Sequence, residues 1–510
     1  MLTPRFTQIV TLMLLALAVS CAPQAPARLS TVPQTDSATA PQPTLQPTQP
    51  PAAESASQPT PAPKPTRDPG APANKQGSDA SQSMFFEVPA HPFDVILGRP
   101  SASSITFSLL SATDQVVSIT YAAENAAPQS ISANLQANLP QEITLSNLAA
   151  DTSYQYSLNN GQQHTFHTAR AAASTFTFTI QADSHLDSNS SLPVYLQTLE
   201  NQRTAQPDFV IDLGDTFMTD KVKPYTNAEP QYWAQRYYFS LLNAPLFLVL
   251  GNHDGEGAPK GSSGQEMSAW SAKLRTQLFP NPTPDAFYTG NTTPEPTVGS
   301  LENYYAWQWG DALFVVLDPY WFTPPLHNDS SLWTPTLGER QYQWLKSTLE
   351  NSSAKWKFVF IHQLIGGYDK NGRGGVEVAS FYEWGGNNAD GSYDFDQNRP
   401  GWGLPIHQLL VQNHVNAVFH GHDHLFVKQE LDGIIYQEVP QPSAARANGT
   451  NSAAEYGYLS GDILGSPGHL LVTVAPGEVK VDYVRSYLPQ DVKPNQQNGQ
   501  IDFTYTIYPR

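Results

Sequence analysis

Seven residues with metal-binding side chains follow five separate apolar runs of the chain. The runs end in the residues Asp183, His185, Asp215, Asn252, His362, His422 and His424. Imidazole, carboxylate and amide oxygen suit iron, zinc or manganese better than calcium. Two such ions held about 3.5–4 Å apart by a shared carboxylate supply the positive charge and the deprotonated nucleophile that attack on an anionic phosphate ester requires. The residue types therefore predict a two-metal site for phosphate ester hydrolysis.

The elements that carry these residues are predicted to be the strands of an α/β domain. From residue 175 onward, apolar runs alternate with amphipathic helical stretches, a pattern typical of α/β folds. Ligands in open α/β sheets bind beyond the carboxyl ends of the strands, so five polar clusters at five strand ends can converge on one site. A single Asp-Ser-His, or one histidine after a strand, would indicate little. The five together, in this order, indicate a common centre.

The order and spelling of the motifs resemble the calcineurin-like metallophosphoesterase family. Asp183-Ser-His185, Gly214-Asp215, Gly251-Asn252-His253-Asp254, His362 and Gly421-His422-Asp423-His424 reproduce every element of the family pattern, over residues 176–484. The resemblance implies a four-layer α/β/β/α sandwich. A preceding β-rich segment makes the purple acid phosphatases the nearest branch.

The resemblance also implies a role for each motif residue. It gives one metal to Asp183, His185 and His424, and the other to Asn252, His362 and His422, with Asp215 as the bridge. His253 would lie over the phosphate, to stabilise the transition state or protonate the leaving group, with Asp254 as its partner. A hydroxide between the two metal ions, iron, zinc or manganese, would be the nucleophile.

Two departures from the resembling families bear on the expected activity. Purple acid phosphatases place tyrosines in the first two motifs, where this chain has His185 and Met218. Since the colour of those enzymes comes from tyrosinate on ferric iron, we expect this protein not to be purple. Met218 also stands where protein phosphatases of the superfamily carry an aspartate that pairs with the catalytic histidine, which disfavours a protein phosphatase.

A glycine-rich segment at 366–375, followed by an aromatic stretch at 381–384, predicts a loop facing the metals. Arg373 could clamp a phosphate oxygen, and Tyr368 could stack on a leaving group. The alternative is that the aromatic residues only cover the core and that Arg373 is an exposed loop cation.

The N-terminal 84 residues are predicted to export and tether the protein. Arg5 and an apolar run at 9–19, too short to span a bilayer, predict a signal peptide over 1–20. Small residues before Cys21 resemble a bacterial lipoprotein signal, which implies a lipidated Cys21 and a membrane lipoprotein facing the extracytoplasmic side. The alternative is a plain secretory signal and a secreted protein. Residues 21–84, rich in Pro, Thr and Ala, predict a disordered spacer.

Two folded regions are expected after the spacer. Short strands over 85–170 are similar to a fibronectin type III β-sandwich, and 171–488 would be the metallophosphoesterase domain. Antiparallel strands with turns at Asp432-Gly433 and Pro476-Gly477 should close a second sheet. Residues 489–510 would be a tail or an edge strand.

Charge limits the partners. The 510 residues include 27 basic and 45 acidic side chains, for a net charge of −18. Nucleic acid is therefore not an expected partner, whereas a small phosphorylated substrate is expected.

A lipoprotein binding or adhesion module with a structural metal site is the alternative function. The hydrolase is favoured because a structural site needs neither an open coordination position nor a spare acid such as His253. The sequence leaves open the choice between monoester and diester, the metal and the oligomeric state.

Overall fold

The computed structural model describes residues 86–257, 264–327, 330–367, 371–445 and 449–510. The predicted signal peptide, Cys21, the spacer and Tyr368 lie outside the described residues. All described residues fall within one compact unit, Gln76–Arg510. None of the helices in the described ranges is long and apolar enough to span a membrane.

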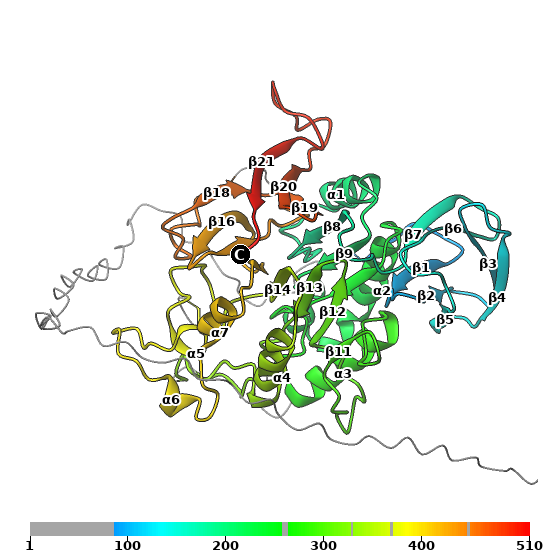
Figure 1. Ribbon diagram of the computed structural model, residues 1–510. Helices are drawn as coiled ribbons and strands as arrows, with labels where there is room; N and C mark the ends of the chain where they lie inside the picture. The colour runs from blue at the N-terminus through cyan, green and yellow to red at the C-terminus, as the bar shows by residue number, and fades with distance from the viewer. Residues whose placement is uncertain (1–85, 258–263, 328–329, 368–370, 446–448) are drawn as a thin grey trace, which may run out of the picture. The chain divides into compact units, whose positions relative to one another are not determined.

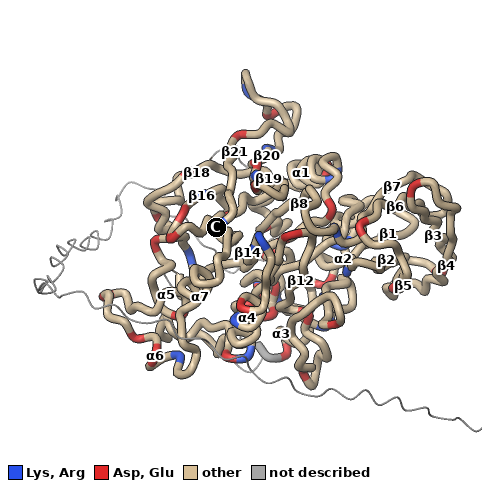
Figure 2. The backbone as a smooth tube through the Cα atoms, viewed as in Figure 1, with Lys and Arg blue, Asp and Glu red and all other residues tan. Residues whose placement is uncertain are grey.

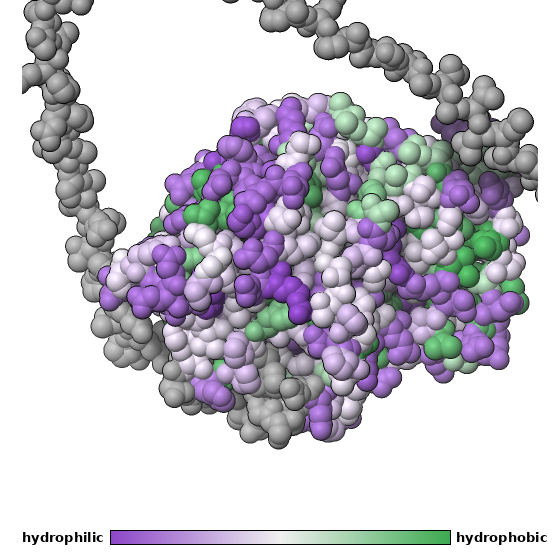
Figure 3. Space-filling view, turned by 60° about the horizontal axis from the view of Figure 1, so that its bottom comes forward, coloured by the Kyte–Doolittle hydropathy of each residue, from purple (hydrophilic) through white to green (hydrophobic). Residues whose placement is uncertain are grey.

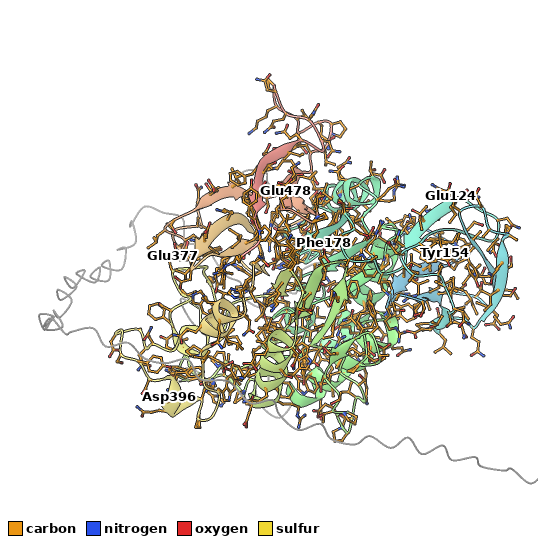
Figure 4. The ribbon with its side chains drawn as sticks, viewed as in Figure 1. Glu124, Tyr154, Phe178, Glu377, Asp396 and Glu478 are labelled. Atoms are coloured by element: carbon orange, nitrogen blue, oxygen red, sulfur yellow. The ribbon has the colours of Figure 1, made fainter. Side chains whose placement is uncertain are left out.

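The first strands of the chain form a small all-β region, as the sequence indicated (Figure 1). One sheet contains β1 (Asp94–Gly98), β2 (Ile105–Leu110) and β5 (Gln141–Leu145). The other contains β3 (Gln115–Ala123), β4 (Gln129–Leu135), β6 (Ser153–Leu158) and β7 (Gln163–His167). All their pairings are antiparallel. Phe107, Ile119 and Tyr156 share the core of this region with Tyr154, which is labelled in Figure 4.

The α/β domain begins with a six-stranded sheet in the order β10-β9-β8-β19-β20-β21. Its strands are β8 (Phe176–Gln181), β9 (Phe209–Asp212), β10 (Leu246–Leu248), β19 (Gly468–Val474), β20 (Val479–Arg485) and β21 (Ile501–Ile507). The first three are parallel to one another, and the last three are antiparallel.

A second, eight-stranded sheet has the order β11-β12-β13-β14-β15-β17-β16-β18. Its strands are β11 (Thr289–Gly290), β12 (Tyr305–Trp309), β13 (Ala312–Val316), β14 (Trp356–Phe360), β15 (Ala417–His420), β16 (Leu425–Leu431), β17 (Ile434–Glu438) and β18 (Asp462–Gly465). The central strands β13, β14, β15 and β17 are parallel.

The two sheets pack face to face, with helices on both outer faces. Phe178 and Phe209 of the first sheet meet Phe314 and Phe358 of the second in one aromatic core (Figure 4). The helices over the six-stranded sheet are α1 (Leu192–Thr204), α2 (Glu229–Ser240) and α3 (Gly264–Leu278). Those over the eight-stranded sheet are α4 (Glu339–Glu350) and α7 (Ile406–Gln412). The predicted four-layer α/β/β/α sandwich is confirmed.

Four short helices lie in the connections. They are η1 (Thr219–Lys221), η2 (Tyr225–Ala228), α5 (Tyr382–Gly385) and α6 (Phe395–Asn398). Acidic and basic residues are scattered over the chain (Figure 2), and hydrophilic residues are prominent on the face seen in Figure 3.

The two predicted hairpins form, but they do not build one sheet. Asp432 and Gly433 both adopt left-handed conformations in the turn between β16 and β17, as a tight hairpin turn requires. That hairpin joins the eight-stranded sheet because β17 pairs with β15, whereas β19 and β20 join the six-stranded sheet because β19 pairs with β8. The C-terminal segment provides the edge strand β21.

Candidate metal centre

Five strand ends bring the seven predicted ligands together. Asp183 and His185 follow β8, Asp215 follows β9, and Asn252 follows β10, all in the six-stranded sheet. The other ligands come from the eight-stranded sheet. His362 follows β14, and the pair His422 and His424 follows β15. The site therefore lies where the carboxyl ends of the parallel strands of both sheets meet.

The ligand atoms form two adjoining clusters. Asp183, His185 and His424 make one, Asp215, His362 and His422 make the other, and within each the candidate ligand atoms lie within 4.8 Å of one another. Asp215 Oδ2 lies 3.5 Å from His185 Nε2 in the first cluster and 3.5 Å from His362 Nε2 in the second. This carboxylate stands between the clusters, as a bridging ligand must.

Buried ligand atoms that lack hydrogen-bond partners show that the site fits metal ions. Within the described residues, the unpartnered buried atoms at the site are Asp183 Oδ1, His185 Nε2, Asn252 Oδ1, His362 Nε2 and His422 Nδ1. Buried polar atoms in native proteins are nearly always satisfied, so a converging group of exceptions requires an explanation. Metal ions coordinated at these atoms would provide it.

The remaining nitrogens of two histidines fix which atom faces the centre. His362 Nδ1 donates a hydrogen bond to the Leu213 carbonyl at 2.8 Å, and His422 Nε2 donates one to the Asn371 carbonyl at 2.6 Å. Because a carbonyl can only accept, that nitrogen of each ring carries a proton, and the other nitrogen is the one that faces the centre and can bind a metal ion. Such hydrogen bonds orient metal-binding histidines in many proteins.

The loops that carry the ligands are backbone-strained. Asp183, His185, Asp215, His422 and His424 all have positive φ, between 52° and 84°. Non-glycine residues rarely adopt this region, and each strained position costs of order 1–3 kcal/mol unless its surroundings enforce it. The site is thus held in shape against local backbone preference.

The histidines and carboxylates shift one another's protonation. Burial raises the pKa of Asp215, but the neighbouring His253 and His362 outweigh it and hold the pKa well below its ordinary value. Burial lowers the pKa of His362, yet Asp215 and Asp183 raise it overall to about 9. Burial prevails at His422 and His424, and lowers their pKa values to about 3 and about 4.

His253 lies beside the two clusters, where its ring can reach a substrate. Its Nε2 is 3.8 Å from Asp215 Oδ2, and its side chain is 18% exposed. Its Nδ1 is 3.0 Å from Asp220 Oδ1, in helix η1. The partner of His253 is therefore Asp220, a residue that the sequence reasoning did not single out.

Asp254, the partner suggested by the sequence, faces elsewhere. Its buried carboxylate accepts hydrogen bonds from the backbone amides of Thr216, Phe217 and Gly251. These hydrogen bonds tie the loop after β9 to the loop after β10. Because three backbone N–H groups hold the Asp254 carboxylate, it is not the group that pairs with the imidazole of His253. Met218 occupies the position where protein phosphatases of the superfamily carry the aspartate partner. Asp220 lies two residues further along the chain, in helix η1.

Arg373 is fixed next to the last motif. Its Nη1 lies 3.0 Å from Asp423 Oδ1, and its guanidinium lies 3.8 Å from the centroid of the Tyr456 ring. Asp423 also accepts hydrogen bonds from the Gly374 amide and the Tyr458 hydroxyl. Arg373 is therefore an anchored cation beside the metal centre and not a free loop side chain. Tyr368 lies outside the described residues.

Comparisons with known proteins agree with this architecture. The family model for calcineurin-like phosphoesterases matches residues 176–426. No curated protein matches the chain. Among solved structures, one titled "Structure of PhoD" is similar with 14% identity and a TM-score of 0.57, over 82% of this chain and 91% of that one. A purple acid phosphatase from yellow lupin (Lupinus luteus) is similar with 14% identity and a TM-score of 0.53, over 81% and 74%.

The fold, the matched motifs and the paired ligand clusters define the class of this protein. Residues 176–426 form a calcineurin-like phosphoesterase domain, preceded by an all-β region. A phosphoesterase domain with candidate ligands for metal ions indicates a hydrolase of phosphoric esters. The resemblance stated from the motifs is confirmed, and a purple acid phosphatase is among the proteins that share the fold.

Proposed function

We propose that this protein hydrolyses small phosphate monoesters or diesters with two metal ions, iron, zinc or manganese, at the extracytoplasmic face of the cell. The observation that carries the proposal is the convergence of candidate ligands in two adjoining clusters, with unpartnered buried ligand atoms after four of the five strands. One ion would be held by Asp183, His185 and His424 and the other by Asn252, His362 and His422, with Asp215 shared. Such a pair of ions supplies positive charge for the phosphate and lowers the pKa of water so that it can attack phosphorus.

The chain's own residues would complete the reaction. His253, with Nε2 directed to the centre, protonates the leaving oxygen, and Asp220 holds its ring in place through Nδ1. Arg373 binds a phosphate oxygen with the guanidinium N–H groups that do not face Asp423. Tyr368, which lies outside the described residues, would stack on a leaving group.

Elemental analysis beside parallel assays of a chromogenic phosphomonoester and a matched diester tests this function. We expect two metals per chain and turnover of one or both esters, with Asp215→Asn losing activity because the shared ligand is removed. Two metals without turnover of either ester would mean a specialised substrate. No metal even after reconstitution would overturn the proposal and return the binding or adhesion module to first place.

We further propose that Cys21 carries a lipid that anchors the chain to a membrane. The proposal rests on the short apolar run before Cys21 and on the small residues that precede it. Mass analysis of the mature N-terminus from membrane fractions tests it. A diacylated Cys21 is expected, and an unmodified start at another residue would leave a plain secretory signal.

A further inference from the structure

Two glutamines of helix α2 support the loops that carry the metal ligands. The Gln231 side chain accepts a hydrogen bond from the Met218 amide at 2.8 Å and donates one to the His185 carbonyl. One turn later, Gln235 Nε2 donates to Ser184 Oγ at 2.9 Å and to the Thr216 carbonyl at 3.0 Å. Both side chains are fully buried. Together they connect the loop after β8 to the loop after β9.

These contacts fall on the strained part of the backbone. Asp183, His185, Leu186 and Asp215 all have left-handed φ values, from 52° to 62°. Strained conformations of this kind persist only where the surrounding structure enforces them. Gln231 binds the carbonyl of one strained residue, and Gln235 binds next to the others. The two side chains therefore restrain the backbone of both loops at or next to the strained residues.

The next residue of α2 faces the all-β region. The buried guanidinium of Arg236 has its Nε 2.7 Å from Asp94 Oδ1 of β1, and its Nη2 donates to the Ser108 carbonyl of β2 at 2.6 Å. Arg236 also donates to the carbonyl of Leu278 at the end of α3. A buried ion pair of this type fixes the relative position of its two elements, because separation would leave a charge uncompensated.

A shared hydrophobic cluster joins the same elements. Ile96 of β1 and Leu110 of β2 belong to one buried cluster with Tyr232 and Tyr238 of α2. Leu186 and Phe217, which follow the ligands His185 and Asp215, belong to it as well. The all-β region thus packs, through α2, against the very segments that position two ligands.

We propose that helix α2 is the positioning element of the metal centre and that the all-β region, through Arg236 and Asp94, is a structural part of that centre. Gln231 and Gln235 hold the two ligand loops, and the Asp94–Arg236 pair holds the helix that carries them. This inference rests on the proposed two-metal function. It assigns to the N-terminal β-sandwich a role in metal affinity that a mere spacer module would not have.

The first test removes the hydrogen bonds of α2 without removing volume. Gln231→Met and Gln235→Met should each weaken metal binding by roughly 10–100-fold, the usual effect of losing a group that orients a ligand. Gln341→Met is the matched control, because Gln341 is an equally buried glutamine on α4 that holds the backbone of Asp318, which is not a ligand. It should bind metal as the wild type does. Calorimetric titration of the metal-free proteins with Zn²⁺ or Mn²⁺ measures this.

The second test breaks the link to the β-region. Asp94→Ala should weaken metal binding in the same direction, whereas Glu142→Ala, which removes the Arg99–Glu142 ion pair within that region, should not. Excess metal should restore kcat in the Gln231, Gln235 and Asp94 variants, and should not restore it in Asp215→Asn. Where Asp94→Ala fails to fold, Asp94→Asn, which removes the charge of the pair and keeps the size of the side chain, takes its place.

The outcomes separate the two proposals. A wild type that binds no metal overturns the two-metal function itself. A wild type that binds two ions, with the Gln231 and Gln235 variants binding as tightly as Gln341→Met, overturns the role of α2 alone. Weaker binding in the α2 variants with unchanged affinity in Asp94→Ala overturns the role of the β-region and keeps that of the helix.

Discussion

The two candidate metal clusters are built from the same residue types but differ in their access to solvent. His362 is completely buried, and the rings of His362 and His422 are each tied to a backbone carbonyl. His424 of the other cluster is 37% exposed, and its ring has no such backbone partner among the described residues. The cluster of Asp215, His362 and His422 is called the closed cluster here, and that of Asp183, His185 and His424 the open cluster.

The difference in solvent access between the two clusters indicates on which side of the site the reaction occurs. Orientation of the closed cluster is enforced by its surroundings, so its ion would serve as a fixed anchor for the shared Asp215. The open cluster lies beside His253, whose ring centroid is 5.8 Å from that of His185. We therefore expect substrate to approach from the side of the open cluster, where the exposed His424 lies.

The largest effect is expected from removing a ligand of the closed cluster. His362→Ala should lose one of two ions and lower activity by at least about 10³-fold, because a catalytic ion contributes several kcal/mol and each 1.4 kcal/mol is a factor of ten. His424→Ala should bind its ion more weakly but recover activity in excess metal, since water can replace an exposed ligand. Metal analysis after gel filtration, with activity followed during metal titration, measures both. Equal losses that added metal does not reverse would abolish the distinction between the clusters.

His253 gives the next largest effect and tests the open side. His253→Ala should keep both metals and lower kcat by about 10²–10⁴-fold, the usual contribution of a general acid. Asp220→Asn should lower kcat less, because the ring remains and only its orientation is lost. Metal content and kcat are measured together. Loss of metal in His253→Ala would make this residue a ligand instead.

Asp254→Asn is the matched comparison for Asp220. An amide in place of this carboxylate cannot accept hydrogen bonds at both oxygens from Thr216, Phe217 and Gly251, so the melting temperature should fall. If Asp254→Asn lowered kcat at unchanged stability while Asp220→Asn had no effect, Asp254 would regain the role of partner to His253.

The convergence of the candidate ligands could be predicted from the sequence because their positions follow from strand ends. Each apolar run is short and predicts a buried strand. The polar residue that follows it must lie at the edge of the sheet, as Asp215 does after β9. The order of strands was less predictable. β17 and β19 read alike as antiparallel strands, yet partner strands distant in sequence sort them into different sheets.

The contacts around the ligands could not be predicted, because they depend on side-chain direction. Asp254 is adjacent to His253 in sequence, but its carboxylate turns towards three backbone amides. Asp220 reaches the ring from a short helix that the sequence did not reveal. Gln231 and Gln235 are polar residues at helical spacing, and nothing in their sequence separates them from surface glutamines. Only the packed position of α2 makes them buried supports.

Each cluster contains one histidine with a raised pKa and one with a lowered pKa, which makes metal binding dependent on pH. In the metal-free state the pKa of His362 is raised to about 9, so this ring is protonated at pH 7, whereas the pKa of His424 is lowered to about 4 and that ring is neutral. A metal displaces the proton of His362, so affinity at the closed cluster should rise up to about tenfold per pH unit between pH 7 and 9. Affinity at the open cluster should rise with pH as well, because burial lowers the pKa of His185 but Asp183, Asp187 and Asp215 raise it well above its ordinary value. Calorimetry in buffers of different ionisation enthalpy counts the protons released, and binding without proton release at pH 7 would contradict the expectation.

The smallest expected effect is an optical one, and it again separates the clusters. The two clusters consist of carboxylates and imidazoles, and Tyr320, whose ring lies 6.2 Å from that of His362, donates its hydroxyl hydrogen bond to Gln363. The protein as isolated should therefore show no strong visible charge-transfer band, even with iron bound. His185→Tyr loaded with ferric iron should gain such a band, because it places a phenolate in the open cluster. A visible band in the wild type would show that a tyrosine outside the two clusters reaches the metal. A colourless, iron-loaded His185→Tyr would show that position 185 does not face the ion.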